Sequence, residues 1–453
     1  MQPRPASLQW EGQAGLDARE SRMRRIVIVG GGFAGLNAAK KLCDRRRFEV
    51  TLVDKENHHV FQPLLYQVAT AALSAEDIAT PLRHVLGRCR NLHVVQARAR
   101  RVDLERRCVV TDAGEYQYDA LLLACGVQNA YFGHPTWEEH APGLKNLAQA
   151  EEIRARLLGA FERAERSTDP REQIRALACV IVGGGPTGVE LAGAIAEIAR
   201  HTLANEFRHI DPRRTRIQLI EAGPRLLADF APRLSERTRR DLERLGVEVR
   251  LNTRVREVGP ERIECEDGST IEATVILWAA GVYGVPIAAT LGVPLDDMGR
   301  VFVAEDCTIP GHPEVFVAGD LAHFVDRGEV LGLVANVAAQ QGRYFARTVR
   351  GDLDGRSRKP FHYFDKGRMA TIGRGRAICE VGPVRFGGFP AWLIWLGIHI
   401  FYLVGLRNRL FVFMQWAWAY LFHRRGARVV VNPQWRTKAA EPAPDSAAVD
   451  RKA

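Results

Sequence analysis

The stretch RIVIVGGGFAG, residues 25–35, decides the fold of this chain. An apolar run of strand length enters a glycine loop, and an Ala- and Leu-rich segment typical of a helix follows. In this pattern Gly30 permits a tight turn, Gly32 lets backbone approach a pyrophosphate, and Gly35 lets helix and strand pack closely. Backbone N–H groups at the start of the helix then face the anion. The stretch therefore predicts a phosphate-binding strand, turn and helix.

The strand expected at residues 49–53 supports this interpretation. It ends at Asp54, nineteen residues after Gly35. A carboxylate at that place accepts hydrogen bonds from ribose hydroxyls in dinucleotide-binding folds.

The same device recurs in the middle of the chain. An apolar run at residues 178–182 leads into GGGPTG, with Gly183, Gly185 and Gly188 in the equivalent places, and a later strand ends at Glu221. The sequence thus predicts two dinucleotide sites on one chain.

The second unit interrupts the first. Each unit closes with a strand that ends in a small-residue turn, at Gly126 and at Gly281, and a further strand at residues 315–318 ends in Gly319 and Asp320. The second unit does not need that last strand, so we expect it to return to the first sheet.

The predicted fold class is α/β, with two nested Rossmann-like dinucleotide-binding domains and a C-terminal strand and amphipathic-helix region that associates with membrane. The predicted boundaries are a disordered extension at 1–23, a first domain at 24–144 and 286–360, a second at 145–285, a C-terminal domain at 361–432 and a disordered tail at 433–453.

Charge and cysteine content narrow the class of protein. The net charge of +10 over 453 residues is spread without long basic runs, which favours anionic nucleotides or lipid over nucleic acid as partners. The eight cysteines form no C-x-x-C pair and no histidine pairing of the kind that binds metal, so we expect no metal site, no redox-active disulfide and a reducing cytoplasm. Two cysteines distant in sequence can still meet in the fold.

The C-terminal region predicts the location. Strands are expected at residues 361–364, 369–372 and 377–381, and two apolar runs follow at 392–406 and 410–422, divided by an Arg-Asn-Arg segment. A membrane span needs about twenty residues, so neither run is long enough. Four of the eight tryptophans lie here, which is typical of helices that lie in the headgroup layer. We expect a peripheral protein on the cytoplasmic side of the cell membrane; the alternative is a buried helical pair or a homodimer interface.

Together these features resemble the type II NADH dehydrogenases, which are single-subunit NADH:quinone oxidoreductases related to the pyridine nucleotide-disulfide oxidoreductases. The resemblance runs from about Arg24 to Val431. Its most specific stretches are HVFQPLLYQVA at residues 59–69, the second glycine loop up to Glu190, WAAG at 278–281, FVAGD at 316–320 and AQQ at 339–341.

The resemblance implies FAD at the first loop, NADH at the second, a quinone at the other face of the flavin, and no ion pumping. Asp320 would hold the ribityl or pyrophosphate region, and Glu221 the NADH ribose. The implied cofactor-binding residues are Gly30, Gly32, Phe33, Ala34, Gly35, Asp54, Lys55, Gly126, Gly319, Asp320, Gly183, Gly185, Gly188, Glu221 and Gly281. The implied catalytic residues are Gln340 and Gln341, which would border the quinone pocket, and Glu190, which would lie near the flavin, linked to that pair, and relay a proton.

Alternatives remain open at several of these positions. Glu190 sits on a predicted helix where a carboxylate can simply face solvent, and the glutamine pair can be ordinary polar helix residues. Cys125 stands where the family usually has Thr, which puts a hydroxyl contact near the flavin in doubt. A sulfide:quinone oxidoreductase, with Cys125 and Cys307 near the flavin, and a low-turnover flavin-binding regulatory protein are the competing functions.

Overall fold

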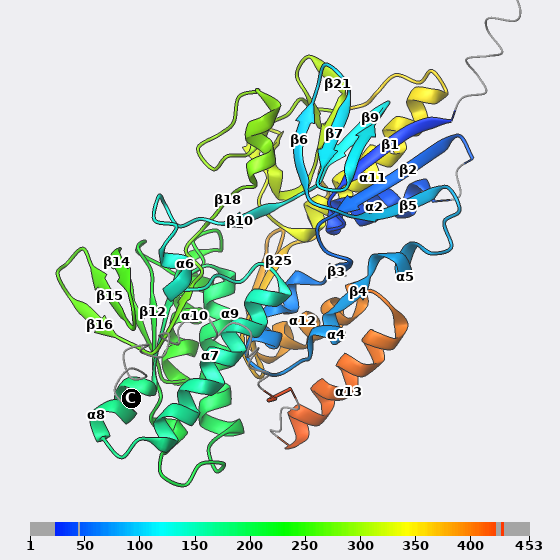
Figure 1. The fold of residues 1–453 in the computed structure, drawn as a ribbon. Coiled ribbons are helices and arrows are strands. Elements are labelled where there is room, and N and C mark those ends of the chain that lie inside the picture. Colours follow the sequence, from blue (N-terminus) through cyan, green and yellow to red (C-terminus); the bar gives the residue numbers. More distant parts are fainter. Residues whose placement is uncertain (1–22, 44–45, 423–426, 430–453) are drawn as a thin grey trace, which may run out of the picture.

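The computed structural model describes residues 23–43, 46–422 and 427–429 of the chain. Two α/β lobes lie side by side, and the last strands and helices pack against both of them (Figure 1). Apart from Met23, the segments predicted to be a disordered extension and a disordered tail lie outside the described residues.

The first lobe is built on a six-stranded sheet with the strand order β20-β21-β9-β1-β2-β5. All but β20 are parallel, and Val29, Val53 and Leu123 are in register at the carboxyl ends of their strands. β21 pairs with β9, so the chain returns to the first sheet as the sequence predicts. The strands are β1 (Arg24–Val29), β2 (Phe48–Asp54), β5 (Leu92–Gln96), β9 (Ala120–Leu123), β20 (Thr308–Ile309) and β21 (His312–Val317).

Two helices, α2 (Phe33–Leu42) and α11 (Ala335–Leu353), pack against each other beside this sheet. Gly342 allows a close approach, because a Cβ atom at this position would lie 2.0 Å from the carbonyl oxygen of Ala34. The middle of α11 therefore lies beside the first turn of α2, which follows the first glycine loop. Smaller elements complete the lobe: β3 (His58–Val60), α3 (Leu65–Ala69), α4 (Ala75–Ile78), β4 (Ala79–Pro81), α5 (Leu82–Leu86), β6 (Ala99–Asp103), β7 (Cys108–Thr111), β8 (Gly114–Gln117), β19 (Val301–Phe302), β22 (Ala322–His323), β23 (Val325–Asp326) and β24 (Glu329–Val330).

The second lobe repeats the plan with a four-stranded parallel sheet, ordered β13-β12-β11-β17. β11 leads into α9 (Pro186–Glu197) as β1 leads into α2. The connections between the lobes run through β10 (Val127–Asn129) and β18 (Val282–Gly284), which pair antiparallel. The other elements are α6 (Trp137–His140), α7 (Leu147–Arg166), α8 (Pro170–Ala176), β11 (Ala178–Val182), β12 (Arg216–Ile220), α10 (Pro232–Arg244), β13 (Val247–Arg250), β14 (Val255–Gly259), β15 (Arg262–Cys265), β16 (Thr270–Glu272) and β17 (Val275–Trp278).

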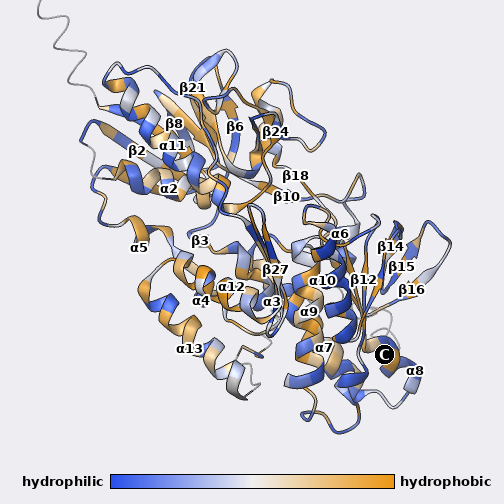
Figure 2. Ribbon diagram, turned by 180° about the vertical axis from the view of Figure 1, so that it is seen from behind, coloured by the Kyte–Doolittle hydropathy of each residue, from blue (hydrophilic) through white to orange (hydrophobic). Residues whose placement is uncertain are grey.

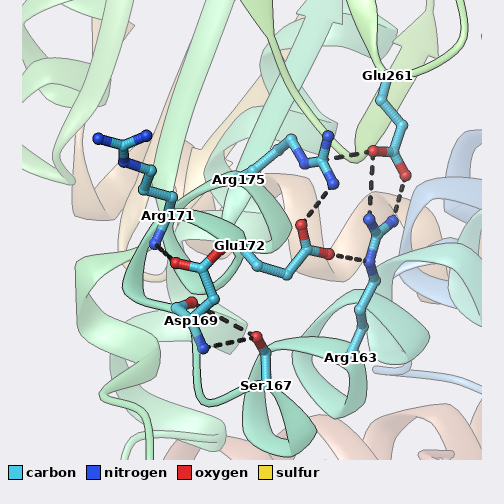
Figure 3. Close-up of polar contacts among 7 residues, drawn as sticks. All are labelled: Arg163, Ser167, Asp169, Arg171, Glu172, Arg175 and Glu261. Carbon is cyan, nitrogen blue, oxygen red and sulfur yellow. Dashed lines mark hydrogen bonds and ion pairs between the residues drawn. The ribbon is translucent and has the colours of Figure 1, made fainter.

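An ion-pair cluster holds the outer edge of the second lobe (Figure 3). Arg163 of α7 contacts Glu172 of α8 at 2.5 Å and also pairs with Glu261 in the turn between β14 and β15. Arg175 bridges the same two carboxylates, at 2.5 and 3.6 Å. Because all four side chains are partly exposed, we expect the network to fix the hairpin against the helices while adding little to global stability.

The C-terminal region is a three-stranded antiparallel sheet followed by two helices, α12 (Phe389–Tyr402) and α13 (Leu406–Phe422). The sheet lies on α9 at Gly193, where a Cβ atom would come within 1.8 Å of the Ile372 carbonyl oxygen. Figure 2 shows apolar residues along both helices. None of the helices in the described part of the chain combines the length and apolar character that a membrane span requires. The strands are β25 (Arg368–Gly373), β26 (Arg376–Val381) and β27 (Val384–Gly387).

Some predicted local structures were wrong. Residues 361–364 form no strand; the backbone of Phe364 is instead hydrogen-bonded through both its N–H and its carbonyl oxygen to the side chain of Gln340. The break between the apolar runs falls at Leu403 and Gly405, and the Arg-Asn-Arg segment lies in the first turns of α13. The chain leaves the first helix at Leu403, whose backbone is extended, and Gly405, with φ at +90°, turns it into the second helix.

One pair of cysteines meets in the fold. Cys43, just after α2, and Cys89, between α5 and β5, form a disulfide across 46 residues of sequence. The predicted reducing compartment rested on the absence of a cysteine pair in the sequence, and this contact removes that support. Only the packing of α2 against the neighbouring turn brings the two thiols together.

Candidate functional site

The first glycine loop has the geometry of a phosphate cradle. Gly30 has φ at +104°, and a Cβ atom there would lie 2.3 Å from the Ala124 carbonyl oxygen. A Cβ atom on Gly35 would lie 1.8 Å from the carbonyl oxygen of Gly30. At Gly32, by contrast, no described atom lies within 4 Å of the Cβ position. Two glycines therefore serve the fold, and the middle one leaves space for a ligand.

The second loop has nearly the same geometry. Gly183 has φ at +109° and a Cβ position 2.4 Å from the Ala279 carbonyl oxygen, and the Cβ position of Gly188 is 1.9 Å from the Gly183 carbonyl oxygen. Gly185 again faces open space among the described atoms. The predicted duplication thus extends to the contacts of each glycine.

A carboxylate closes each loop from the next strand. Asp54 accepts hydrogen bonds from the backbone N–H groups of Gly31 at 2.5 Å and Glu56 at 2.8 Å. Glu221 accepts from Gly184 and Gly223, both at 2.6 Å. Burial raises the pKa of Asp54, which these amide hydrogen bonds partly oppose.

Both loops fit the pyrophosphate of a dinucleotide. The first turns of α2 and α9, which are fully described, carry no acidic residue, and neither helix has a side-chain cap on its first N–H groups. Those donors and the positive end of the helix dipole therefore face the open side of the middle glycine.

A large cavity of about 3120 Å³ extends from the first loop to the C-terminal helix α12. We call it the large cavity. It reaches Glu190 on the side of α9 and His399, Phe401 and Tyr402 at the end of α12. Of the predicted residues, those that line it are Gly30, Gly32, Phe33, Ala34, Asp54, Lys55, Gly126, Gly319, Asp320 and Glu190. Gly35, Gly183, Gly185, Gly188, Glu221, Gly281, Gln340 and Gln341 are not among its described lining residues.

Two opposite charges, Lys145 and Asp320, line the large cavity and interact electrostatically. Asp320 follows β21, and burial raises its pKa, while Lys145 and Arg300 act in the opposite direction. Burial lowers the pKa of Lys145, which Asp320 opposes. Each charge in this pair therefore partly stabilises the other where water is scarce.

Glu190 lies where two cavities meet. It lines the large cavity and also a separate space of about 310 Å³ between α3, α9, β25, α12 and α13, which we call the small cavity. Burial raises the pKa of Glu190 to about 8, and the backbone hydrogen bond with Thr371 acts in the opposite direction. The carboxyl is therefore mostly protonated at pH 7 and can donate a proton.

The two glutamines have hydrogen-bond partners other than Glu190 among the described residues. Gln340 is half-buried and bonds the backbone of Phe364, as described above. Gln341 is buried and accepts a hydrogen bond from the Gly319 N–H at 2.7 Å, whereas its Nε2 atom finds no partner among the described residues. No hydrogen bond between Glu190 and either glutamine is present in the described part of the chain. The border role of the pair stays a prediction.

The two cysteines that a sulfide:quinone oxidoreductase would use, Cys125 and Cys307, are poorly placed for that chemistry. Cys125 lines the large cavity, but its Sγ lies 3.5 Å from the Val29 carbonyl oxygen and burial raises its pKa to about 12. Cys307 is buried and absent from the described lining, and burial raises its pKa as well. Neither thiol is in the ionised state that sulfur chemistry requires.

Sequence reasoning missed three residues of the large cavity. His59, with a pKa lowered to about 4 by burial, lies with Nδ1 2.9 Å from the Gly31 carbonyl oxygen. His399, also lowered to about 4 by burial, stacks on Trp395 at 4.1 Å. Lys145 is the third. Only His59 carried a signal, because it begins the specific stretch at residues 59–69; the other two depend on tertiary contacts.

Comparisons with known proteins agree with this geometry. The family model described as pyridine nucleotide-disulphide oxidoreductase matches residues 24–342, and the model of the NDH2 C-terminal domain matches residues 366–425. The type II NADH:quinone oxidoreductase Ndh of Mycobacterium tuberculosis is 43% identical over 432 residues, which cover 92% of each chain. NdhA of the same organism is 44% identical over 425 residues, covering 90% of this chain and 89% of the relative.

Solved structures show the same fold. NDH2 from Plasmodium falciparum in complex with NADH aligns with a TM-score of 0.81 at 18% identity, covering 91% of this chain and 100% of that chain. The sulfide:quinone oxidoreductase from Aquifex aeolicus aligns with a TM-score of 0.69 at 18% identity, covering 85% of this chain and 92% of that chain.

Proposed function

The chain belongs to the type II NADH:quinone oxidoreductases of the pyridine nucleotide-disulphide oxidoreductase family, and we propose that FAD occupies its first glycine loop, NADH the second, and a membrane quinone the α12 end of the large cavity. The observation that carries this proposal is the continuity of the large cavity from Gly32 past Glu190 to α12. One space thus joins a dinucleotide cradle, a proton-donating carboxyl and an apolar helix end.

FAD bound here would supply the chemistry, as an acceptor of hydride from NADH and a donor of two electrons to the quinone. The chain supplies binding and charge. Gly32 and the N-terminus of α2 would hold the pyrophosphate of FAD, and Asp54 its adenosine ribose. Asp320 would bind the ribityl or pyrophosphate region. Gln341 would act through the backbone of Gly319, whose N–H donates to its side chain.

Glu190 would donate a proton to the quinone oxygen. Its carboxyl stays mostly neutral at pH 7 because burial raises its pKa to about 8. A donor with a pKa near the working pH combines the correct protonation state with adequate acidity. With no charge path across a membrane in this scheme, the reaction would move electrons without pumping ions.

The C-terminal helices would attach the protein to the cytoplasmic side of the membrane as a peripheral protein. The exposed fractions of Leu406 and Met414 are 72% and 66%, far above what apolar side chains show in a core. Arg407 lies over the ring of Phe411 at 5.3 Å, which places a cation beside the apolar surface. Such a surface binds lipid through apolar burial and charge together.

Two half-reactions test the central proposal. Mixing the purified protein with NADH in a stopped-flow instrument should bleach the flavin absorbance, and a short-chain benzoquinone should restore it. Persistent bleaching in the presence of quinone would contradict the proposed acceptor site.

Surface substitutions test the membrane attachment better than a truncation does. Trp395 is only 2% exposed and belongs to the core, so deletion of α12 would uncover apolar surface. We expect Leu406→Ser combined with Met414→Ser to release the protein from vesicles that contain anionic lipid, while salt alone releases it only in part. Ile174→Ser, at a site 70% exposed on α8, serves as the control. Release of a monomer from a soluble dimer would instead support the homodimer interface.

A further inference from the structure

One face of α9 leads from the interior to the surface. Glu190, Glu197 and His201 follow one another at spacings of seven and four residues, with Ala194 between the first two, so they lie on one side of the helix. His201 belongs to the π-helical turn, Ile198–Thr202, that continues α9. Glu190 borders the large cavity, Glu197 is half-buried and His201 is exposed. The three titratable groups therefore form a graded series from cavity to solvent.

The small cavity lies along this face. All four residues line it, together with Tyr66 and Gln67 of α3 and the tryptophans Trp392, Trp395 and Trp416 of the C-terminal helices. Its volume of about 310 Å³ has room for several water molecules. Glu190 separates it from the large cavity, because that residue lines both.

The chemistry requires a proton from solution. Reduction of a quinone to a quinol takes two electrons and two protons, and NADH delivers two electrons with one hydrogen as hydride. The balanced reaction is NADH + H⁺ + quinone → NAD⁺ + quinol, so one proton enters per turnover. When the large cavity holds cofactor and substrates, its own water is displaced, and a donor at Glu190 needs another route for its next proton.

We propose that the small cavity is the proton inlet of this enzyme, in which His201 and Glu197 take up a proton from solution and pass it through water to Glu190. This inference rests on the proposed donor role of Glu190. Glu190 and Glu197 are about 10 Å apart along the helix axis, which is too far for direct transfer and within reach of a short water chain. The backbone N–H of Arg374, in the turn after β25, donates to Glu197 and holds its carboxylate on the cavity side.

Other charged and titratable groups face the same space. They are Arg374 and Arg376 from the β25–β26 hairpin, Tyr66 from α3 and Tyr420 from α13. The guanidinium of Arg374 lies 4.2 Å from the centre of the Tyr420 ring. Arg374 and Arg376 therefore bring positive charge to the cavity that Glu197 lines.

The test compares Glu197→Gln and His201→Asn with a matched pair on the same lobe. Glu165 and His209 form a surface carboxylate–histidine contact at 2.9 Å and line neither cavity among the described residues. We expect Glu197→Gln to slow flavin reoxidation by quinone about tenfold at pH 8.5, and His201→Asn about threefold, with flavin reduction by NADH unchanged. At pH 6 both deficits should shrink, because protons are then abundant. Glu165→Gln and His209→Asn should have no effect.

Chemical rescue provides a second readout. Formate and azide are both small enough for the small cavity. Either should restore the rate of flavin reoxidation in Glu197→Gln and leave that rate unchanged in the unaltered protein. His201→Asn is a surface change that leaves the fold intact and answers the question if Glu197→Gln destabilises the lobe. If Glu190→Gln slows reoxidation while both inlet variants match the controls, the inlet is wrong and the donor role stands. If Glu190→Gln has no effect, the donor role fails and the inlet fails with it.

Discussion

The two glycine loops have the same internal geometry in different surroundings. In each, the first and third glycines touch backbone oxygens and the middle one faces open space. The first loop opens into the large cavity, which α11, the lobe connections and α12 also line. Of the second loop and its helix, only Pro186, Thr187 and Glu190 are among the described lining residues. Under the proposed function, nearly identical cradles would serve a retained cofactor in one lobe and an exchanging substrate in the other.

The helices that follow the loops differ at one equivalent position. Five residues beyond the middle glycine, α2 carries Asn37 and α9 carries Glu190. Asn37 donates to the Phe33 carbonyl oxygen at 2.8 Å and accepts from Arg343 at 2.8 Å, so its amide is structurally engaged. Glu190 faces two cavities instead. The two units thus share the cradle but differ here, with a hydrogen-bonded amide in the first and a cavity-lining carboxyl in the second.

The largest expected difference between the two loops comes from replacing the middle glycine of each by a larger residue. Gly32→Val should leave the protein folded but without flavin, because the new side chain occupies ligand space. Gly185→Val should retain flavin and weaken NADH binding by at least about a hundredfold, a loss of about 3 kcal/mol. Flavin absorbance and NADH titration measure the two effects. Gly159→Ala on α7, which also faces open space, is the control. Loss of flavin in Gly185→Val would break the assignment of cofactors to loops.

Removing the carboxyl at Glu190 should affect one half-reaction only. We expect Glu190→Gln to slow reoxidation by quinone about a hundredfold and leave reduction by NADH within about twofold. In the unaltered protein, reoxidation should fall as pH rises through about 8, because the donor is then ionised. The variant should lack that step. Stopped-flow measurements of the reoxidation rate from pH 6 to 9.5 test this. If the rate still falls near pH 8 in the variant, the pH dependence belongs to another group.

Coenzyme preference should depend on the carboxylate of the second loop alone. Glu221 would repel the 2′-phosphate of NADPH. Arg225 lies nearby in sequence, but one of its N–H groups is directed to the Ala228 carbonyl oxygen at 2.5 Å. We expect kcat/KM for NADH to exceed that for NADPH at least about tenfold, and Glu221→Gln to narrow the ratio. Asp54→Asn in the first loop should weaken flavin retention without changing the ratio. Equal efficiency with NADPH in the unaltered protein would contradict the assignment.

The smallest expected effect is on stability. Since the pKa of Glu190 is raised from its ordinary 4.5 to about 8 in the folded state, the folded protein holds a proton that the unfolded chain releases between those values. Stability should therefore decline as pH rises from about 4.5 to about 8. Glu190→Gln should remove that decline and be more stable than the unaltered protein at pH 9, relative to their difference at pH 4.5. The full rise in pKa sets a ceiling of about 5 kcal/mol, and partial exposure of the side chain should reduce the effect to on the order of 1–2 kcal/mol. Urea unfolding of the flavin-free proteins at both pH values measures the free energy of unfolding. If it changes with pH equally in both proteins, water in the cavities hydrates the carboxylate and its pKa is not raised.

Much of the fold and part of the candidate site could be predicted from sequence. The loops were predictable because a positive φ and a backbone contact under 2.5 Å exclude every side chain except that of glycine. The strand-end carboxylates were predictable because chain direction fixes which end of a parallel strand meets the loop. The return of β21 followed from counting strands. Each of these signals lies within a few residues of sequence.

The tertiary structure alone decided the remaining features. Gln340 and Gln341 are neighbours in the sequence, yet one bonds Phe364 and the other Gly319, because successive helix residues point about 100° apart. Lys145 faces Asp320, and Cys43 meets Cys89, across long separations that leave no periodic pattern. The position of Glu190 between two cavities depends on how closely β25 approaches Gly193 and on where α12 and α13 pack. Sequence specifies short-range geometry through sterics, whereas burial and charge environment arise from surfaces that meet only when the chain has folded.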